Sequence, residues 1–424
     1  MSRLRRLRWP TVPAGLPLLQ RHNFRVVQLE GLGVSLANAA NPFLPVFLAR
    51  LGASNFQVGL LSAMPAFTGL LLSVAVGSWL LSARNVAPWY GRARLLSILP
   101  LALTGLVTLL LPARFSVTAV LVIWALATVP QVVVNVTFSV VMNAVAGPKH
   151  RYDLLSRRWS VMGLITAVLI ALLGQVLERL RFPVNYQLAF MGLSLGGLAS
   201  LYFANRLRLP DNPPRGGSRE SWPAQWRAFG SLLRGRPAFV SFTAKRFIYM
   251  AGFALAVPLF PLYYVRVAHA NDGAIGLIAT AQTLTLLIGY RLWTRLSERR
   301  GARPALLLTT LALSLYPVLT AATQAVPLIA LLAGLAGIFQ AGFDLVFFDE
   351  MMKRVPLNHA PLFVSFDQST QNLAAVAAPL VGTLLADRLG LGGALLVSGG
   401  LRFLAFILLI RGGAVAEAAT EVAA

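Results

Sequence analysis

Long apolar blocks alternate with short polar segments along almost the whole chain. The blocks are about 17 to 28 residues long, and roughly 20 helical residues suffice to cross the hydrocarbon core of a bilayer. We therefore expect twelve transmembrane helices. The expected spans cover residues 24–48, 56–81, 95–111, 117–145, 159–177, 184–205, 238–265, 274–293, 305–322, 327–352, 361–385 and 391–410.

One polar stretch, residues 206–237, has the proline, glycine and charge content of a linker and divides the spans six and six. The expected fold class is an all-α membrane protein with two pseudo-symmetric six-helix halves, residues 1–205 and 238–424. Within the linker, residues 221–236 mix tryptophan and leucine with arginine. This segment either lies on the membrane surface or is a simple tether.

Composition makes the bilayer the natural solvent, because 57% of residues are hydrophobic and only 12% are charged, against about 25% charged in soluble domains. The formal charge of +23 does not indicate a nucleic-acid partner, since the basic residues lie between apolar blocks. The chain has no cysteine, and its four histidines fall in expected loops. We therefore expect no metal site, no cofactor and no catalytic residue.

The positive charges gather on one side of the predicted membrane. Of the 37 Lys and Arg residues, 30 flank one set of loops, 6 flank the other set, and Arg402 lies inside the last span. The positive-inside rule then places both termini and the linker in the cytoplasm. The arginine-rich N-terminal arm lacks an apolar core long enough for a signal peptide. We expect an uncleaved, multi-pass protein of the cytoplasmic (inner) membrane.

Residues 294–303, between the eighth and ninth spans, read TRLSERRGAR. This segment resembles the cytoplasmic signature G-x-L-x-D-R-x-G-x-R/K of the major facilitator superfamily. Leu296, Arg299, Gly301 and Arg303 match it, whereas Thr294 and Glu298 depart from it. The resemblance implies a conformational latch of Glu298, Arg299, Gly301 and Arg303, in which the acid pairs with arginines and the glycine allows a tight turn. The alternative is a loop that only sets topology.

The resemblance also implies a twelve-helix fold and a central cavity lined by the first, fourth, seventh and tenth helices. Proton-driven drug antiporters of the family carry a Gly-Pro motif in the fifth helix and often an arginine inside the fourth. The spans 159–177 and 117–145 have neither. The absence of both features argues against proton-driven multidrug antiport.

Three of the four expected cavity helices carry polar side chains in helical register. The candidate substrate-binding residues are Asn38, Asn41, Gln131, Asn135 and Gln340. Amides of this kind can bind a ligand, but they can equally bond a neighbouring helix.

Asp344 lies four residues after Gln340, on the same helical face, about 12 Å from the cytoplasmic end of its span. A buried carboxyl without a cation nearby is suited to reversible protonation, so Asp344 is the first candidate for proton coupling and Glu30 the second. The competing interpretation is a structural ion pair of Asp344 with one of three bases, Lys245, Arg246 or Arg402. Asp367 is expected at the cytoplasmic interface.

Together these features predict a monomeric secondary transporter that moves a small neutral or amphipathic solute by alternating access, with proton coupling as a hypothesis. Its expected partners are the solute and the lipid bilayer, with no nucleic acid. The alternatives are an integral-membrane lipid-modifying enzyme and a gated channel. The enzyme would usually present clustered Asp, His or Cys at an interface, and the channel would be expected to repeat a pore motif.

Overall fold

The computed structural model describes residues 17–82, 85–209, 236–354 and 360–421, in which every regular element is a helix. The N-terminal arm and residues 221–235 of the linker lie outside these ranges. Eleven helical segments of the described residues are long and apolar enough to cross a membrane. The last of them, Phe366–Arg411, is interrupted at Gly390, where φ is 77°. Counting its two parts separately gives the twelve expected spans.

The N-terminal half contains six helical elements. They are α1 Leu18–Asn38, α2 Phe43–Arg50, α3 Asn55–Ser82, α4 Ala87–Leu110, α5 Ala113–Arg179 and α6 Val184–Ala204. Helix α5 includes two of the apolar segments, Arg114–Ala146 and Leu154–Arg179. The prediction of a loop between the fourth and fifth spans is therefore wrong, because residues 146–158 are helical throughout.

The C-terminal half repeats this pattern. Its elements are α8 Pro237–Ala256, α9 Leu259–Arg266, α10 Asp272–Arg300, α11 Ala302–Ala321, α12 Val326–Met352 and α13 Ala360–Glu421. Helix α13 packs on α8 and α11, and α10 packs on α12. Close helix crossings need small residues; a Cβ on Gly337 of α12 would lie 2.3 Å from the Gln282 carbonyl oxygen of α10.

The first and seventh spans, each expected as one helix, are both broken. α1 gives way to α2 around the sequence NPFLP (residues 41–45), and α8 gives way to α9 around VPLFP (residues 257–261). Proline lacks the N–H that continues a helix and its ring clashes with the preceding turn. The two sequences lie at the same offset in their halves, since 258 − 42 = 216 and 261 − 45 = 216. This internal repeat indicates that the two halves are structurally equivalent.

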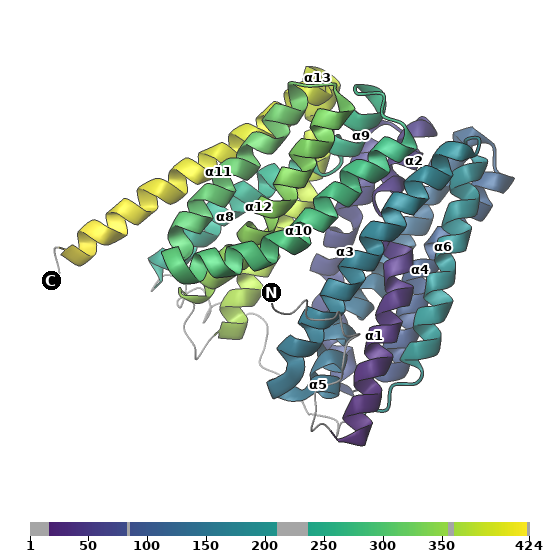
Figure 1. The fold of residues 1–424 in the computed structure, drawn as a ribbon, viewed down its shortest axis with the longest axis horizontal. Coiled ribbons are helices and arrows are strands. Elements are labelled where there is room, and N and C mark those ends of the chain that lie inside the picture. The colour runs from purple at the N-terminus through teal and green to yellow at the C-terminus, as the bar shows by residue number, and fades with distance from the viewer. Residues whose placement is uncertain (1–16, 83–84, 210–235, 355–359, 422–424) are drawn as a thin grey trace, which may run out of the picture.

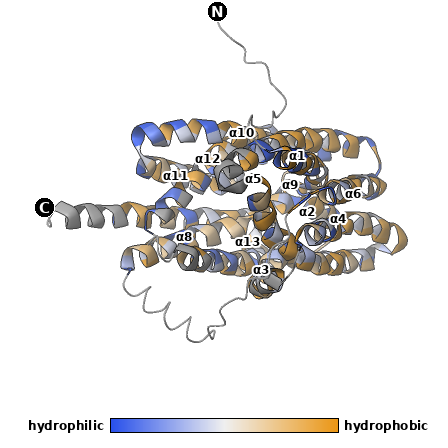
Figure 2. Cartoon of the chain, turned by 90° about the horizontal axis from the view of Figure 1, so that it is seen from below, coloured by the Kyte–Doolittle hydropathy of each residue, from blue (hydrophilic) through white to orange (hydrophobic). Residues whose placement is uncertain are grey.

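The two halves touch mainly through α3 with α13 and α5 with α10, and also where α9 meets α2 and α3. In Figure 1 they meet near α2 and α9 and diverge toward the opposite end. Figure 2 shows apolar residues along most of the helices, and many large apolar side chains are exposed, as expected for contact with lipid. We call the end at α2 and α9 the closed end.

Candidate functional site

The amides expected to bind substrate line two cavities of the described structure, one mainly in each half. The first, of about 540 Å³, is lined by residues of α1, α3, α4 and α5. The second, of about 350 Å³, is lined mainly by α8, α9, α10 and α11, with residues of α2, α12 and α13. Asn41, at the break between α1 and α2, belongs to both linings. The broken first span therefore brings the two cavities together.

The amides expected to bind substrate lie around these cavities. Asn38, Asn41, Gln131 and Asn135 line the first cavity, and Gln340 lines the second. The Gln131 amide donates to the Asn135 side-chain oxygen at 3.0 Å, which fixes this pair along α5. Aromatic side chains complete the walls, with Trp124, Phe138 and Trp159 in the first cavity and Phe253, Phe260, Tyr264 and Tyr316 in the second.

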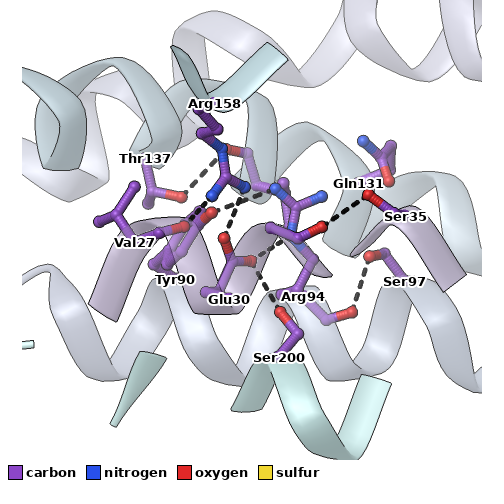
Figure 3. Close-up of polar contacts among 12 residues, drawn as sticks. Val27, Glu30, Ser35, Tyr90, Arg94, Ser97, Gln131, Thr137, Arg158 and Ser200 are labelled. Carbon is purple, nitrogen blue, oxygen red and sulfur yellow. Dashed lines mark hydrogen bonds and ion pairs between the residues drawn. The ribbon is translucent and has the colours of Figure 1, made fainter. Parts of the chain in front are cut away.

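Glu30 does not line a cavity; it lies behind the first one, fully buried. One carboxylate oxygen lies 2.5 Å from Arg158 Nη2, and the other accepts a hydrogen bond of 2.7 Å from the Ser200 hydroxyl. Arg94 Nε lies 3.4 Å from Glu30 Oε1, an ion-pair distance. Figure 3 shows this cluster, which joins α1, α4, α5 and α6.

The positive-inside count included Arg94 and Arg158 among the basic residues of the expected cytoplasmic loops, and they had no further predicted role. Both guanidinium groups line the first cavity, and Arg158 is 2% exposed. Arg158 also donates to the Val27 carbonyl; a Cβ on Gly31 would lie 2.9 Å from its Nη1, so the glycine makes room for this contact. One carboxylate thus faces two guanidinium groups, which leaves a net positive charge beside the cavity.

A second buried ion pair occupies the equivalent place in the C-terminal half with the charges exchanged. Arg246 of α8 pairs with Asp367 of α13, and Arg246 follows Glu30 by the same offset, 246 − 30 = 216. Asp367 is 3% exposed. Asp367, expected at the cytoplasmic interface, follows the first residue of the last apolar segment, Phe366–Arg411, and its carboxylate there neutralises a buried base.

Asp344 lies with Gln340 on one face of α12, as expected. Its carboxylate accepts hydrogen bonds from the Gln340 amide at 2.8 Å and from the Tyr290 hydroxyl at 3.3 Å, and its side chain is exposed at the protein surface. Among the ion pairs of the described residues, none joins Asp344 to Lys245, Arg246 or Arg402. Both donors favour the ionised carboxylate, and the exposed Asp344 differs from the buried carboxyl that the sequence predicted.

The remaining acidic cluster, at the end of α12, is satisfied locally. Lys353 Nζ lies 2.7 Å from Asp349 and 3.0 Å from Glu350, and Arg354 lies 2.8 Å from Glu350. Hydrogen bonds from the Lys353 ammonium to Asp349 and then Glu350 raise its pKa above the ordinary value. In the described part of the chain no three His, Asp or Glu side chains are placed to hold a metal ion.

Polar contacts between the halves gather at the closed end. Asp272 of α10 is central to them, because Arg50 lies 3.0 Å from its carboxylate and the Tyr186 hydroxyl donates to it. Arg50 also donates to the Ala270 carbonyl at 3.2 Å. Asp272 is only 4% exposed, so this contact seals the end of the molecule.

A second set of contacts at the closed end mirrors the first. Arg266 ends α9 as Arg50 ends α2, and 266 − 50 = 216. Arg266 donates to the Ala53 carbonyl and, at 2.6 Å, to the Asn55 side-chain oxygen. The Asn55 amide in turn donates to Asp387 at 2.7 Å, which joins α3 to α13. We call the two sets together, centred on Arg50 and Arg266, the gate.

The residues expected to form a latch lie at the opposite end, where α10 ends and α11 begins. Gly301 has a φ of 82°, which confirms the tight turn that a glycine allows there. Glu298 is exposed and makes no ion pair with any residue that the structure describes. Glu298 is therefore without an ion-pair partner among the described residues in a conformation whose two halves diverge at this end.

Comparisons with known proteins agree with this geometry. The sequence profile of the Major Facilitator Superfamily matches residues 245–422. Multidrug resistance protein MdtG of Proteus mirabilis (strain HI4320) is 27% identical over 165 residues, which are 38% of this chain and 41% of the relative. MdtG of Salmonella choleraesuis (strain SC-B67) is 28% identical over 167 residues, with the same shares of 38% and 41%. The match spans about two fifths of the length of these curated relatives.

Solved structures match over nearly the whole chain. The nucleoside transporter NupG has a TM-score of 0.64 at 12% identity, over 93% of this chain and 99% of its own. A bacterial metal transporter has a TM-score of 0.65 at 16% identity, over 94% and 99%. A POT family transporter in complex with a thioalcohol-conjugated peptide has a TM-score of 0.67 at 11% identity, over 94% and 96%. At these identities the likeness concerns the fold.

Proposed function

We propose that the chain is a member of the Major Facilitator Superfamily, whose profile matches residues 245–422, and that it is a secondary transporter that moves a small neutral or amphipathic solute across the cytoplasmic membrane by alternating access. The matches to this family support a transporter over the lipid-modifying enzyme that the sequence left as an alternative. The aromatic side chains of both cavities support an amphipathic solute.

One observation carries this proposal: the two halves are sealed by the gate at one end and diverge at the other, with a cavity in each half between these ends. A carrier needs a site that opens to one side at a time. The positive-inside rule assigns the divergent end to the cytoplasm, so we assign this conformation as inward-open, with both termini in the cytoplasm.

The proposed roles follow the geometry. Asn38, Asn41, Gln131, Asn135 and Gln340 would contact the solute. Asp344 would couple transport to protons, while Glu30, held by two arginines, is the weaker candidate. In the proposed latch of Glu298, Arg299, Gly301 and Arg303, Glu298 would pair with an arginine when the cytoplasmic end closes, and Gly301 would allow the turn. We propose a monomer as the transporting unit, since each chain carries both halves.

The chain has no cysteine, so a pair of introduced cysteines can be cross-linked without reaction at any native thiol. Cysteines at Asn55 and Asp387, whose side chains are hydrogen-bonded across the gate, would be joined by a short bifunctional thiosulfonate in proteoliposomes. Counterflow of amphipathic solutes, measured with no energy source, should stop on cross-linking and return on reduction. The single-cysteine variants treated with the same reagent are the controls. Undiminished counterflow in the cross-linked protein would contradict alternating access.

A further inference from the structure

Arg402 is a buried charge that the transport scheme above leaves without a role. It lies on α13, is 2% exposed, and lines the second cavity. Its Nε is buried without a hydrogen-bond partner, and no described Asp or Glu lies within ion-pair distance of it. An unpaired guanidinium at membrane depth is costly and usually marks a functional site.

Arg402 has one structural contact that has to be weighed first. Its Nη1 donates to the Leu313 carbonyl of α11 at 3.1 Å. Pro317, four residues on, has no N–H, so this carbonyl has lost its helical partner. A neutral donor such as glutamine could satisfy the same carbonyl, and the positive charge therefore remains unexplained by this contact.

The surroundings stabilise a cation but do not neutralise it. Arg402 lies over the Phe253 ring, with 5.2 Å between its Cζ and the ring centroid, and such contacts are worth about 0.5 to 2 kcal/mol. The Tyr249 hydroxyl, close enough to interact electrostatically, is buried and has no hydrogen-bond partner. No acid lines either cavity, whereas Arg94 and Arg158 line the first one. The missing anion is expected to arrive with the ligand.

We propose that Arg402 is the anchor for an oxyanion, a carboxylate or a phosphonate-like group, on an amphipathic cargo. This rests on the proposed transport function and narrows its substrate class. The apolar or aromatic body of the cargo packs against Phe253, Phe260 and Tyr316, which share the cavity with Arg402. Arginine suits this role because its planar fork binds an oxyanion through two hydrogen bonds.

The test compares three probes of one skeleton on the purified full chain in detergent: 4-phenylbutyrate, its neutral amide and 4-phenylbutylamine. Scanning fluorimetry titrations report binding as an upward shift of Tm. We expect the carboxylate to raise Tm and the amide and amine to leave it unchanged. Arg402→Gln should weaken carboxylate binding about 10-fold or more, while Arg388→Gln, an exposed arginine of the same helix, should bind like the parent. Phenylphosphonate, which has an aromatic body, and inorganic phosphate, which has none, show whether the anionic head group alone is enough to raise Tm.

The outcomes separate this site from the transport function. Equal response to the carboxylate and the amide, no response of the parent to any probe, or full response in Arg402→Gln would each overturn the assignment. If Arg402→Gln does not fold, Arg402→Lys keeps the charge and should retain weakened binding; a failure of both to fold would make Arg402 structural and end the proposal. If the carboxylate binds but no solute shows counterflow, the anion site stands and the proposed transport function is refuted. If only neutral solutes show counterflow, the transport function stands and the anion site is refuted.

Discussion

The buried cluster around Glu30 gives a prediction whose sign follows from counting charges. Glu30 carries the one negative charge between Arg94 and Arg158. Glu30→Gln would leave two guanidinium groups facing each other without an anion. Removing one partner of a buried pair typically costs about 3 to 5 kcal/mol, and we expect a loss of this size. Arg158→Gln is milder, because Glu30 keeps Arg94 at 3.4 Å and Ser200 at 2.7 Å.

The double variant decides between this reasoning and simple loss of contacts. Glu30→Gln with Arg158→Gln leaves Arg94 alone, at 11% side-chain exposure beside the cavity. We therefore expect the double variant to be more stable than Glu30→Gln, with a coupling free energy toward the upper end of the about 0.5 to 3 kcal/mol seen for residues in contact.

Equilibrium unfolding in mixed micelles, followed by tryptophan fluorescence, measures all of these variants. Glu298→Gln, an exposed acid without an ion pair in the described structure, is the matched control and should unfold like the parent. A Glu30→Gln variant as stable as this control, or a double variant less stable than Glu30→Gln, would refute the charge count.

Three further predictions concern transport. Asp344→Asn should keep counterflow but lose the response of net transport to an imposed proton gradient; a structural acid would instead show lower stability and an unchanged response. Glu298→Gln should favour the inward-open conformation, measured as faster labelling of a cysteine placed at Gln340 from the cytoplasmic side, and an unchanged rate would leave the latch unsupported. Cysteines at the exposed positions Arg114 and Arg299 should label from outside the cell and only after permeabilisation, respectively, and the reverse pattern would invert the topology.

The number of spans, their division into two halves and the amides around the cavities could be predicted from sequence, because the bilayer imposes one requirement on every block. The partner of Glu30 could not. Arg158 lies 128 residues further along the chain, and a basic residue near a helix end fits the topology rule whether or not it is buried. Only the packing of α1 against α5 shows that Arg158 is buried against Glu30 rather than exposed at a helix end.

Pro258 and Pro261 predicted bends in the seventh span, but the break in the first span lay in the sequence and was missed. Hydropathy averages over a window, so two prolines inside an apolar block hardly change it. The repeat of x-P-x-x-P at residues 41–45 and 257–261 was the signal that could have located both breaks and the short helices that carry Arg50 and Arg266.

Two of these prolines, Pro45 and Pro261, also affect the hydration of the second cavity. Pro45 and Pro261 have no N–H to bond the carbonyls four residues earlier, those of Asn41 and Val257. All four residues line the second cavity. A backbone carbonyl without a partner is tolerated at membrane depth only beside water or another donor, so ordered water is expected there before any solute enters. The solute must displace that water, and a cargo with its own hydrogen-bond donors would lose less on dehydration than one without them.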